Sequence, residues 1–576
     1  MEENRVWQGG TPGKILVLYP KIEKSGRKSG VSLDKSTKKY YSLLCNLDSR
    51  TLGSETFPNG NGSGVRHPDF SIRLICIRRK CDALQRHLDA HHQPARPLRR
   101  RQPGQASFFV CRFSGGGRSE ILADPAAESH GIRRFPYQSC STFAGNHYLI
   151  DLDTLVEEGL LEKADLAGIE WCRREDKVDF GLLYNNRLKV LRKAYSRFTG
   201  GPAFDAFLTE NESWLPDFGL YMALKDRFGG KAWYEWEDGL KFRHREVIEA
   251  YRAALADEIR FFGFVQFLFL GQWNALRDYA HNKDIRIIGD VPIYVPYDSV
   301  DVWTNTGLFA LDQQLRPVDV AGCPPDAFSA EGQLWGNPLY RWDVIAADGY
   351  RWWLARLGAA GQWYDTVRLD HFRGFEAYWA VPYGDKDARG GRWVKGPAMD
   401  FVRAMKEGLP GLDIIAEDLG YLTREVRELR DGSGWPGMKI LEFAFDLREP
   451  ANYLPHTYTK NTVCYTGTHD NMTMRQWFDT ADADSRRYAM DYMNLADESA
   501  AVWGAIRTAY ATVSDTVIIQ MQDFLDLGAE GRMNFPGTLT DLNWTWRAKD
   551  GIIGKPLAEK IKMLTEIYCR TGSEEE

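Results

Sequence analysis

Short apolar runs that each end in an acidic residue recur along the second half of the chain. In the run 366–375, apolar Val367 and Leu369 alternate with charged Arg368 and Asp370, which is the period-2 pattern of a β-strand. Similar apolar runs, each followed by an acidic residue where the apolar pattern breaks, occupy 285–295, 412–420 and 462–471. The stretches between them are long enough for helices, and this β-α alternation predicts a parallel α/β barrel.

The acids at the ends of these strands predict a catalytic cleft. In a parallel barrel the C-terminal strand ends carry the side chains that meet the substrate, so Asp370 is a candidate nucleophile. Arg368 lies one pleat earlier on the same face, and a nearby cation keeps a carboxylate ionised. A structural ion pair at a strand end would show the same two residues. Several carboxylates converging on one cleft favour cleavage of a glycosidic bond, with one attacking, one protonating the leaving oxygen and one steadying positive charge.

The amino-acid composition of the stretches between these runs predicts the other elements of the fold. Residues 154–260 are amphipathic and rich in Leu, Ala, Glu, Lys and Arg, which predicts a helical insertion beside the barrel. Residues 318–342 are rich in Pro, Gly and polar groups, and a structureless loop of that length is typical of a functional lid. The strands expected from the pattern cover 148–153, 285–288, 365–369, 413–416, 440–445, 463–466 and 516–521.

Composition narrows the class of protein. A hydrophobic content of 44% and a charged content of 26% are those of a soluble globular protein. The 9 cysteines are odd in number and scattered, without metal-ligand or disulfide spacing, so we expect a reducing, cytoplasmic compartment. No stretch of about 18 uncharged apolar residues predicts a membrane span, and the N-terminus lacks the order of a secretory signal.

The first 135 residues differ from the rest of the chain. They hold 24 Lys and Arg against 12 Asp and Glu, whereas the whole chain has a net charge of −6. Basic clusters at 21–39 and 96–101 and a glycine-rich linker at 59–64 leave almost no apolar periodicity. A nucleic-acid-binding arm would explain the charge. The sequence pattern changes abruptly at Pro136.

From Pro136 to about Lys549 the chain resembles the 4-α-glucanotransferases, also called amylomaltases or disproportionating enzymes. The resemblance is carried, in order, by PYQS (136–139), GDVPIYV (289–295), PPDAFS (324–329), GQLWGNPLY (332–340), VRLDHFRG (367–374), AEDLG (416–420), GTHDN (467–471), RMNFPG (532–537) and NWTWR (543–547). It implies an interrupted (β/α)8 TIM barrel with helical insertions. It also implies an enzyme that acts on α-1,4-glucans and maltooligosaccharides without a metal or organic cofactor. From the sequence itself we expect neither nucleic-acid nor membrane partners.

Matched position by position, the resemblance assigns roles to individual residues. Asp370 resembles the nucleophile, Glu417 the general acid/base, and Asp470 the third acid, which holds the sugar's 2- and 3-hydroxyls. Arg368 and His469 resemble the partners at the sugar that bears the broken bond. The positions that resemble substrate contacts are Tyr137, Asp290, Phe328, Gln333, Trp335 and Asn534. Two alternatives stay open: Phe328 and Trp335 as packing residues of their loop, and Asp290 as an acid that caps a turn.

The implied reaction is a retaining double displacement. Asp370 attacks the anomeric carbon while protonated Glu417 donates to the departing oxygen, and Glu417 then activates an acceptor hydroxyl. We expect the loop 318–342 to cover the site. It departs from the family at Ala327, where a tyrosine is usual, so an α-glucan hydrolase of similar barrel type is the alternative within enzymes.

The front of the chain lacks the segments with which the family begins its barrel, which resemble ITSLPGPYGVGSLG and WQILPLNPTGYGDS. Residues 123–135 can be back-translated so that a reading one base later gives QILPLNPTGYGD and a serine codon. The same displacement over 91–105 gives ITSLPGPYGVGSLG. We therefore expect residues from about 91 to 135, and further upstream, to be an out-of-frame translation. The first βα unit would then be missing or scrambled, with an open seam in the barrel. An inactive, glucan-binding product of a frameshifted gene is the alternative outside enzymes.

Overall fold

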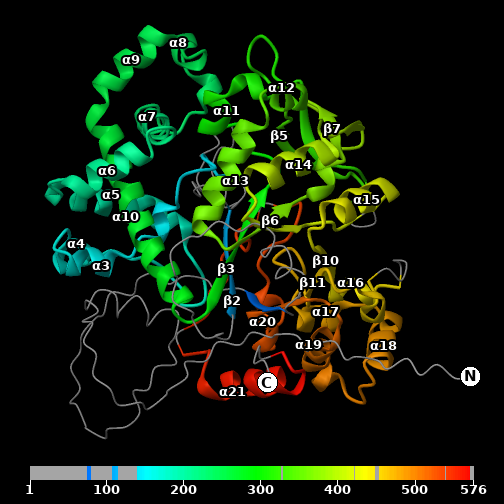
Figure 1. The fold of residues 1–576 in the computed structure, drawn as a ribbon. Coiled ribbons are helices and arrows are strands. Elements are labelled where there is room, and N and C mark those ends of the chain that lie inside the picture. Colours follow the sequence, from blue (N-terminus) through cyan, green and yellow to red (C-terminus); the bar gives the residue numbers. More distant parts are fainter. Residues whose placement is uncertain are drawn as a thin grey trace, which may run out of the picture.

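The computed structural model describes residues 139–325, 329–420, 422–447, 453–538, 540–549 and 551–570, together with the backbone of two strands at 74–78 and 107–114. Within these residues one eight-stranded sheet has the order β10-β11-β12-β1-β2-β3-β6-β9 (Figure 1). Its strands are β1 (Leu74–Arg78), β2 (Ser107–Ser114), β3 (Ile285–Pro292), β6 (Thr366–Asp370), β9 (Asp413–Ala416), β10 (Gly437–Ile440), β11 (Thr462–Tyr465) and β12 (Thr516–Gln520).

The two ends of this sheet meet. The Ala416 N–H donates to the Pro436 carbonyl at 2.9 Å, and the Met438 N–H donates to Asp418 Oδ1 at 2.7 Å. The residue numbers rise together across this junction, so β9 and β10 run in the same direction. The pairs β2–β3, β3–β6 and β6–β9 are parallel, as are β10–β11 and β11–β12. The C-terminal ends of these strands therefore gather at one mouth of a closed barrel.

The seam between β12 and β3 is filled by the front of the chain. β1 pairs with β12 and with β2, antiparallel in both cases, and β2 pairs parallel with β3. The prediction of an open seam is therefore wrong, because both flanking strands find backbone partners there. β1 nevertheless runs against its neighbours, which differs from the strand direction of a regular (β/α)8 barrel.

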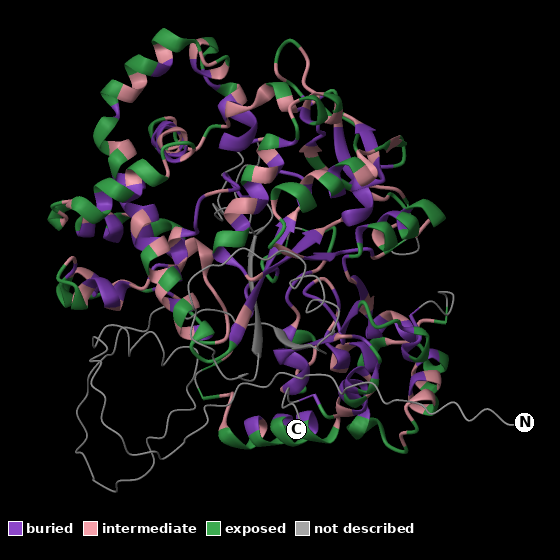
Figure 2. Cartoon of the chain, in the orientation of Figure 1, coloured by how far each residue is buried: buried purple, intermediate pink, exposed green. Residues whose placement is uncertain are grey.

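The barrel strands are covered on both faces. In β6 every residue except Asp370 is buried, and Val367 and Leu369 are fully enclosed. Val463 and Val517 are buried in the same way in a second apolar cluster around β10, β11 and β12. Figure 2 shows buried strands surrounded by helices whose outer faces are exposed. Such strands read as nearly continuous apolar runs, which is why a charge at a strand end is informative.

Helices occupy most of the chain between the start of the described region and β3. They are η1 (His147–Leu149), α3 (Leu152–Glu157), α4 (Lys163–Leu166), α5 (Phe180–Arg197), α6 (Pro202–Glu210), α7 (Leu215–Arg227), η2 (Trp233–Glu235), α8 (Asp238–Lys241), α9 (Arg245–Ala254) and α10 (Ala256–His281). The strand expected at 148–153 is wrong. Asn146 Oδ1 accepts from the Tyr148 N–H at 2.9 Å and Asp151 Oδ2 from the Thr154 N–H at 2.8 Å, so both side chains cap helices.

A second sheet of four strands, β5-β4-β7-β8, packs beside the barrel. It contains β4 (Asp319–Cys323), β5 (Gln333–Pro338), β7 (Ala377–Pro382) and β8 (Arg392–Lys395). The stretch 318–342 is thus not structureless, because β4 and β5 pair antiparallel within it. Gly322 permits this pairing, since a Cβ there would lie 2.5 Å from the Gln333 carbonyl oxygen.

The remaining elements surround these two sheets. They are α11 (Val300–Thr304), η3 (Thr306–Leu308), α12 (Trp342–Ala347), α13 (Arg351–Trp363), η4 (Phe372–Phe375), α14 (Ala398–Gly408), α15 (Arg424–Ser433), α16 (Leu441–Ala444), η5 (Pro455–Thr457), α17 (Met474–Thr480), α18 (Ala483–Tyr492), η6 (Glu498–Ala500), α19 (Ala501–Ala511), α20 (Met521–Phe524), η7 (Ala529–Gly531) and α21 (Lys555–Ile567). The strand expected at 440–445 is also wrong, because β10 ends at Ile440 and α16 follows directly. None of the described helices combines the length and apolarity needed to cross a bilayer.

Candidate active site

The predicted acids lie at the C-terminal mouth of the barrel. β6 ends at Asp370, β9 ends one residue before Glu417, and the turn after β11 carries His469 and Asp470. Since the strands that bear them are parallel, these side chains emerge at the same mouth.

Arg368 links β3 to β6 beneath this mouth. Its Nη1 donates to both carboxylate oxygens of Asp290, at 2.7 and 2.8 Å, and lies 2.8 Å from Asp370 Oδ1. Asp290 stands opposite Arg368 in the register of the two strands, and its carboxylate pairs with the cation. The guanidinium thus bridges two carboxylates and favours the ionised form of Asp370.

Glu417 is buried next to this ion pair. Its Oε1 accepts from the Leu419 N–H at 2.8 Å, and its Oε2 accepts from the His371 N–H at 2.7 Å. Burial raises the pKa of Glu417 to about 8, and the negative charge of Asp370 acts in the same direction while Arg368 opposes it. The carboxyl group therefore holds its proton at neutral pH.

His371 has a strained backbone, with φ 54° and ψ 46° in the left-handed region. This conformation turns the chain so that its N–H reaches Glu417. Burial and the charge of Arg373 lower the pKa of His371 to about 3, so its ring is neutral. The sequence pattern did not single out this residue, because no alternation of apolar and polar residues reveals a left-handed non-glycine.

Asp470 is the more open of the acids, with 40% of its side chain exposed, compared with 26% for Asp370. His469 Nε2 lies 2.7 Å from Asp470 Oδ2, and Asn534 Nδ2 donates to Oδ1 at 2.8 Å. Arg532 Nη2 also donates to the Asp470 carbonyl at 3.3 Å. These contacts hold the third acid in one orientation toward the mouth.

Two further acids lie under the turn that carries Asp470. Glu442 accepts hydrogen bonds from the Met472 backbone and the Asn471 side chain, and burial raises its pKa to about 8 although Arg532 lowers it. Asp523 accepts from Thr466 Oγ1 at 2.5 Å, and burial raises its pKa to about 7. Neither acid was predicted. Glu442 does follow an apolar run, but it falls inside the strand expected at 440–445 and so did not stand out as an acid at a strand end.

The structure brings most of the predicted substrate contacts to this mouth. Gln333 Oε1 accepts from Trp335 Nε1 at 3.2 Å, and the Trp335 ring meets the His371 ring edge-on with centroids 4.8 Å apart. Asn534 contacts Asp470 as described above. Tyr137 and Phe328 lie outside the described residues. In the described part of the chain, no three His, Cys, Asp or Glu side chains form a metal-type cluster.

The three acids differ in ways that match separate chemical tasks. Asp370 is partly exposed and paired with a cation, Glu417 is buried and protonated, and Asp470 is partly exposed beside His469. One ionised and one protonated carboxyl in the same cleft are what a retaining glycosidic reaction requires.

Comparison with known proteins agrees with this chemistry. A family model described as 4-alpha-glucanotransferase matches residues 116–552. The chain belongs to the 4-alpha-glucanotransferase family. It is 47% identical over 473 residues to the 4-alpha-glucanotransferase of Clostridium butyricum, covering 81% of this chain and 96% of that protein. It is 42% identical over 444 residues to the enzyme of Thermus thermophilus, covering 75% and 88%.

Solved structures of this family have the same fold. The amylomaltase of Streptococcus agalactiae in complex with acarbose is 41% identical and superposes with a TM-score of 0.74, covering 76% of this chain and 89% of that chain. The amylomaltase of Corynebacterium glutamicum, at 18% identity and a TM-score of 0.62, shares the fold. The predicted family and fold class are thus confirmed. The family match begins at residue 116, inside the stretch 91–135 for which we expect an out-of-frame reading.

Proposed function

We propose that this protein is a 4-α-glucanotransferase that moves α-1,4-glucan segments between maltooligosaccharides. The observation that carries the proposal is the pairing at the ends of two adjacent strands. Asp370 is ion-paired with Arg368, and the neighbouring Glu417 is kept protonated by burial.

In the first step Asp370 Oδ attacks the anomeric carbon, and the bond from that carbon to the leaving oxygen breaks. Glu417 gives its proton to the leaving oxygen, so the departing glucan carries a neutral hydroxyl. In the second step an acceptor hydroxyl transfers its proton to Glu417 and displaces Asp370. The configuration at the anomeric carbon is inverted twice and so retained.

The residues around this pair position the sugar. Asp470, with His469 and Asn534, is suited to bind the 2- and 3-hydroxyls, since it offers an open carboxylate next to two donors. Asp290, Gln333 and Trp335, together with Tyr137 and Phe328, complete the proposed contacts.

The β4–β5 hairpin supports transfer in preference to hydrolysis. Its Trp335 packs against His371, directly after the nucleophile. A cover at this position excludes water and leaves the intermediate to a sugar hydroxyl. We place the reaction in the cytoplasm, in line with the scattered cysteines.

Incubation with maltotriose tests the proposal. Transfer yields glucose together with a ladder of longer chains, whereas the hydrolase alternative yields only shorter sugars. The Asp370→Asn variant serves as the matched control, and it should bind maltooligosaccharide without turnover. Absence of longer chains from the wild-type protein would refute the transferase assignment.

A further inference from the structure

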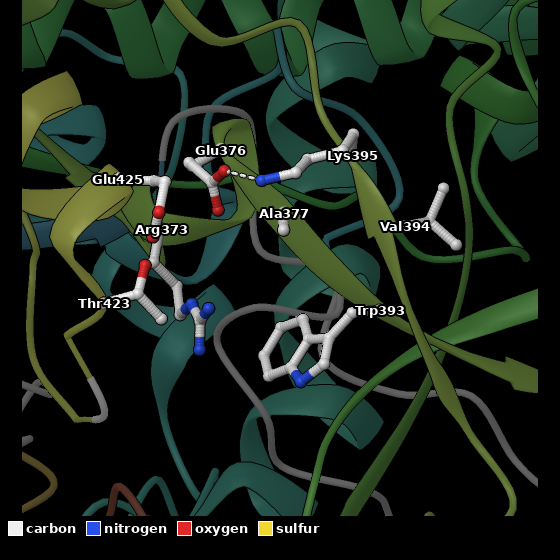
Figure 3. Close-up of a pocket in the computed structure, with 8 residues that line it drawn as sticks. All are labelled: Arg373, Glu376, Ala377, Trp393, Val394, Lys395, Thr423 and Glu425. Atoms are coloured by element: carbon white, nitrogen blue, oxygen red, sulfur yellow. Dashed lines mark hydrogen bonds and ion pairs between the residues drawn. The ribbon is translucent and has the colours of Figure 1, made fainter.

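A pocket lies between η4, β8 and the start of α15 (Figure 3). Its cavity volume is about 180 Å³, below the roughly 300–1,000 Å³ of drug-sized ligand sites, so it suits a ligand no larger than about one sugar unit. It is lined by Arg373, Glu376, Ala377, Trp393, Val394, Lys395, Thr423 and Glu425. None of the three catalytic acids lines it, and we call it the Trp393 pocket.

The pocket combines an exposed aromatic ring with buried charges. Trp393 is 42% exposed, and it is the one tryptophan of the described residues in the exposed class. The Arg373 guanidinium carbon lies 3.9 Å from the centroid of this ring, although only 6% of Arg373 is exposed. Glu376 is also buried and is ion-paired with Lys395. A large ring left in water beside oriented donors and acceptors is typical of a binding surface.

The charges of the lining favour a neutral, polar ligand. Two cations, Arg373 and Lys395, are balanced by two carboxylates, Glu376 and Glu425. An anion would meet both carboxylates, and a cation would meet both basic groups. A pyranose ring avoids both problems, since it presents an apolar C–H face to an aromatic ring and hydroxyls to charged side chains, which act as donors and acceptors.

The pocket is also continuous with the catalytic residues along the chain. η4 begins two residues after Asp370, and residues 418–422 lead from Glu417 to Thr423. Two walls of the pocket are therefore extensions of the strand ends that carry the proposed nucleophile and acid.

We propose that the Trp393 pocket binds a non-reacting glucose unit of a long α-1,4-glucan whose reacting part lies at the catalytic mouth. This inference rests on the proposed function for its substrate class. Binding here would increase affinity for long chains and would leave the chemistry on short ones unchanged.

Transfer kinetics on amylose and on maltotriose test the proposal in Trp393→Ala, with Trp393→Phe as the conservative variant. Tyr383→Ala is the matched control, because Tyr383 is a similarly exposed aromatic residue directly after the neighbouring β7 and does not line the pocket. We expect Trp393→Ala to raise KM for amylose about 3- to 10-fold, as for loss of one aromatic contact, with kcat and maltotriose kinetics unchanged. Trp393→Phe should restore most of the affinity, and Tyr383→Ala should behave as wild type.

Retardation in an amylose-containing native gel gives a readout that does not depend on turnover. In the Asp370→Asn background, Trp393→Ala should migrate faster than its parent. Equal retardation of the two would overturn the proposal, as would an equal loss of activity on maltotriose and amylose. Failure of the wild-type protein to elongate maltotriose would instead refute the proposed function, and the gel would still report on the pocket.

Discussion

Replacing Glu442 by Gln should stabilise the fold at neutral pH. Glu442 is 7% exposed, and burial raises its pKa to about 8 from an ordinary 4.5. Below pH 4.5 the group is protonated in both the folded and the unfolded chain. As the pH rises above that value the unfolded chain ionises while the folded protein keeps its proton, so stability is lost progressively until the pH passes about 8.

The magnitude follows from this pKa difference. Each pH unit in the window costs about 1.4 kcal/mol, which gives roughly 3 kcal/mol at pH 7 and about 5 kcal/mol over the whole window. Glutamine carries no charge in either state and avoids this loss. Its oxygen can replace the atom that accepts from Met472 and Asn471, and its amide can occupy the place of Oε2, for which the described residues provide no hydrogen-bond partner. An amide nitrogen at that place would have no hydrogen-bond partner among the described residues, which offsets about 1 kcal/mol.

Calorimetric Tm values of the two proteins, measured at equal scan rate from pH 5 to 8.5, test this reasoning. In a chain of several hundred residues 1 kcal/mol shifts Tm by on the order of 1 °C, so we expect a gain of about 2–3 °C at pH 7 that shrinks toward pH 5. Glu407→Gln, at an exposed position on α14, controls for the loss of a charge as such. A Tm difference that is flat with pH, or a variant less stable than wild type above pH 7, would show that Glu442 is ionised in the fold.

Three further predictions concern the catalytic mouth and the front of the chain. Glu417→Gln should lower kcat for maltotriose transfer about 10²- to 10⁴-fold, and an unchanged kcat would exclude Glu417 as the acid. Wild-type activity should decline as the pH rises through about 8, because Glu417 loses its proton there. Arg368→Lys should lower Tm and reduce kcat/KM about 10- to 100-fold, because one ammonium cannot reproduce the planar guanidinium between Asp290 and Asp370; wild-type kinetics in this variant would contradict the bridge. The encoding DNA, read one base later over codons 91–135, should give the family-like sequence, and sequencing across codons 80–140 checks this. A frame-restored chain should exceed this one in soluble yield and in transfer activity.

The catalytic mouth could be predicted because its signal is local. A strand buried on both faces is mostly apolar and its C-terminal end opens toward the cleft, so Asp370 and Glu417 mark the ends of β6 and β9 in the sequence itself. The observed strands β9, β11 and β12 begin within one residue of the predicted positions. The link from Arg368 to Asp370 also follows from the pleat, since residues two apart share a face.

The residues that contact the acids and their turns from other parts of the chain could not be predicted, because these contacts form only in the folded protein. The N–H of His371 reaches Glu417 through a left-handed turn that no spacing encodes. Glu442 contacts a turn about thirty residues later in the chain, and the proximity of β10 to that turn exists only after the barrel has closed. The β4–β5 hairpin escaped prediction for another reason. Its glycines, which allow close pairing and left-handed turns, are the same residues that indicate a loop.

The strand pairing at the seam between β12 and β3 shows that backbone hydrogen bonds can form even where the side-chain pattern does not specify a strand. Any extended segment can pair with the open edges of β12 and β3, because the donors and acceptors belong to the main chain. Strand direction and register depend more on the side chains, since a slip reverses which residues face the core. At this seam β1 runs antiparallel to both neighbours, and the pairing of β2 with β3 shifts register between Val110 and Ser114. A closed barrel with one reversed strand is therefore compatible with a segment whose side chains were read in the wrong frame. A frame-restored chain should replace β1 by a strand parallel to both neighbours.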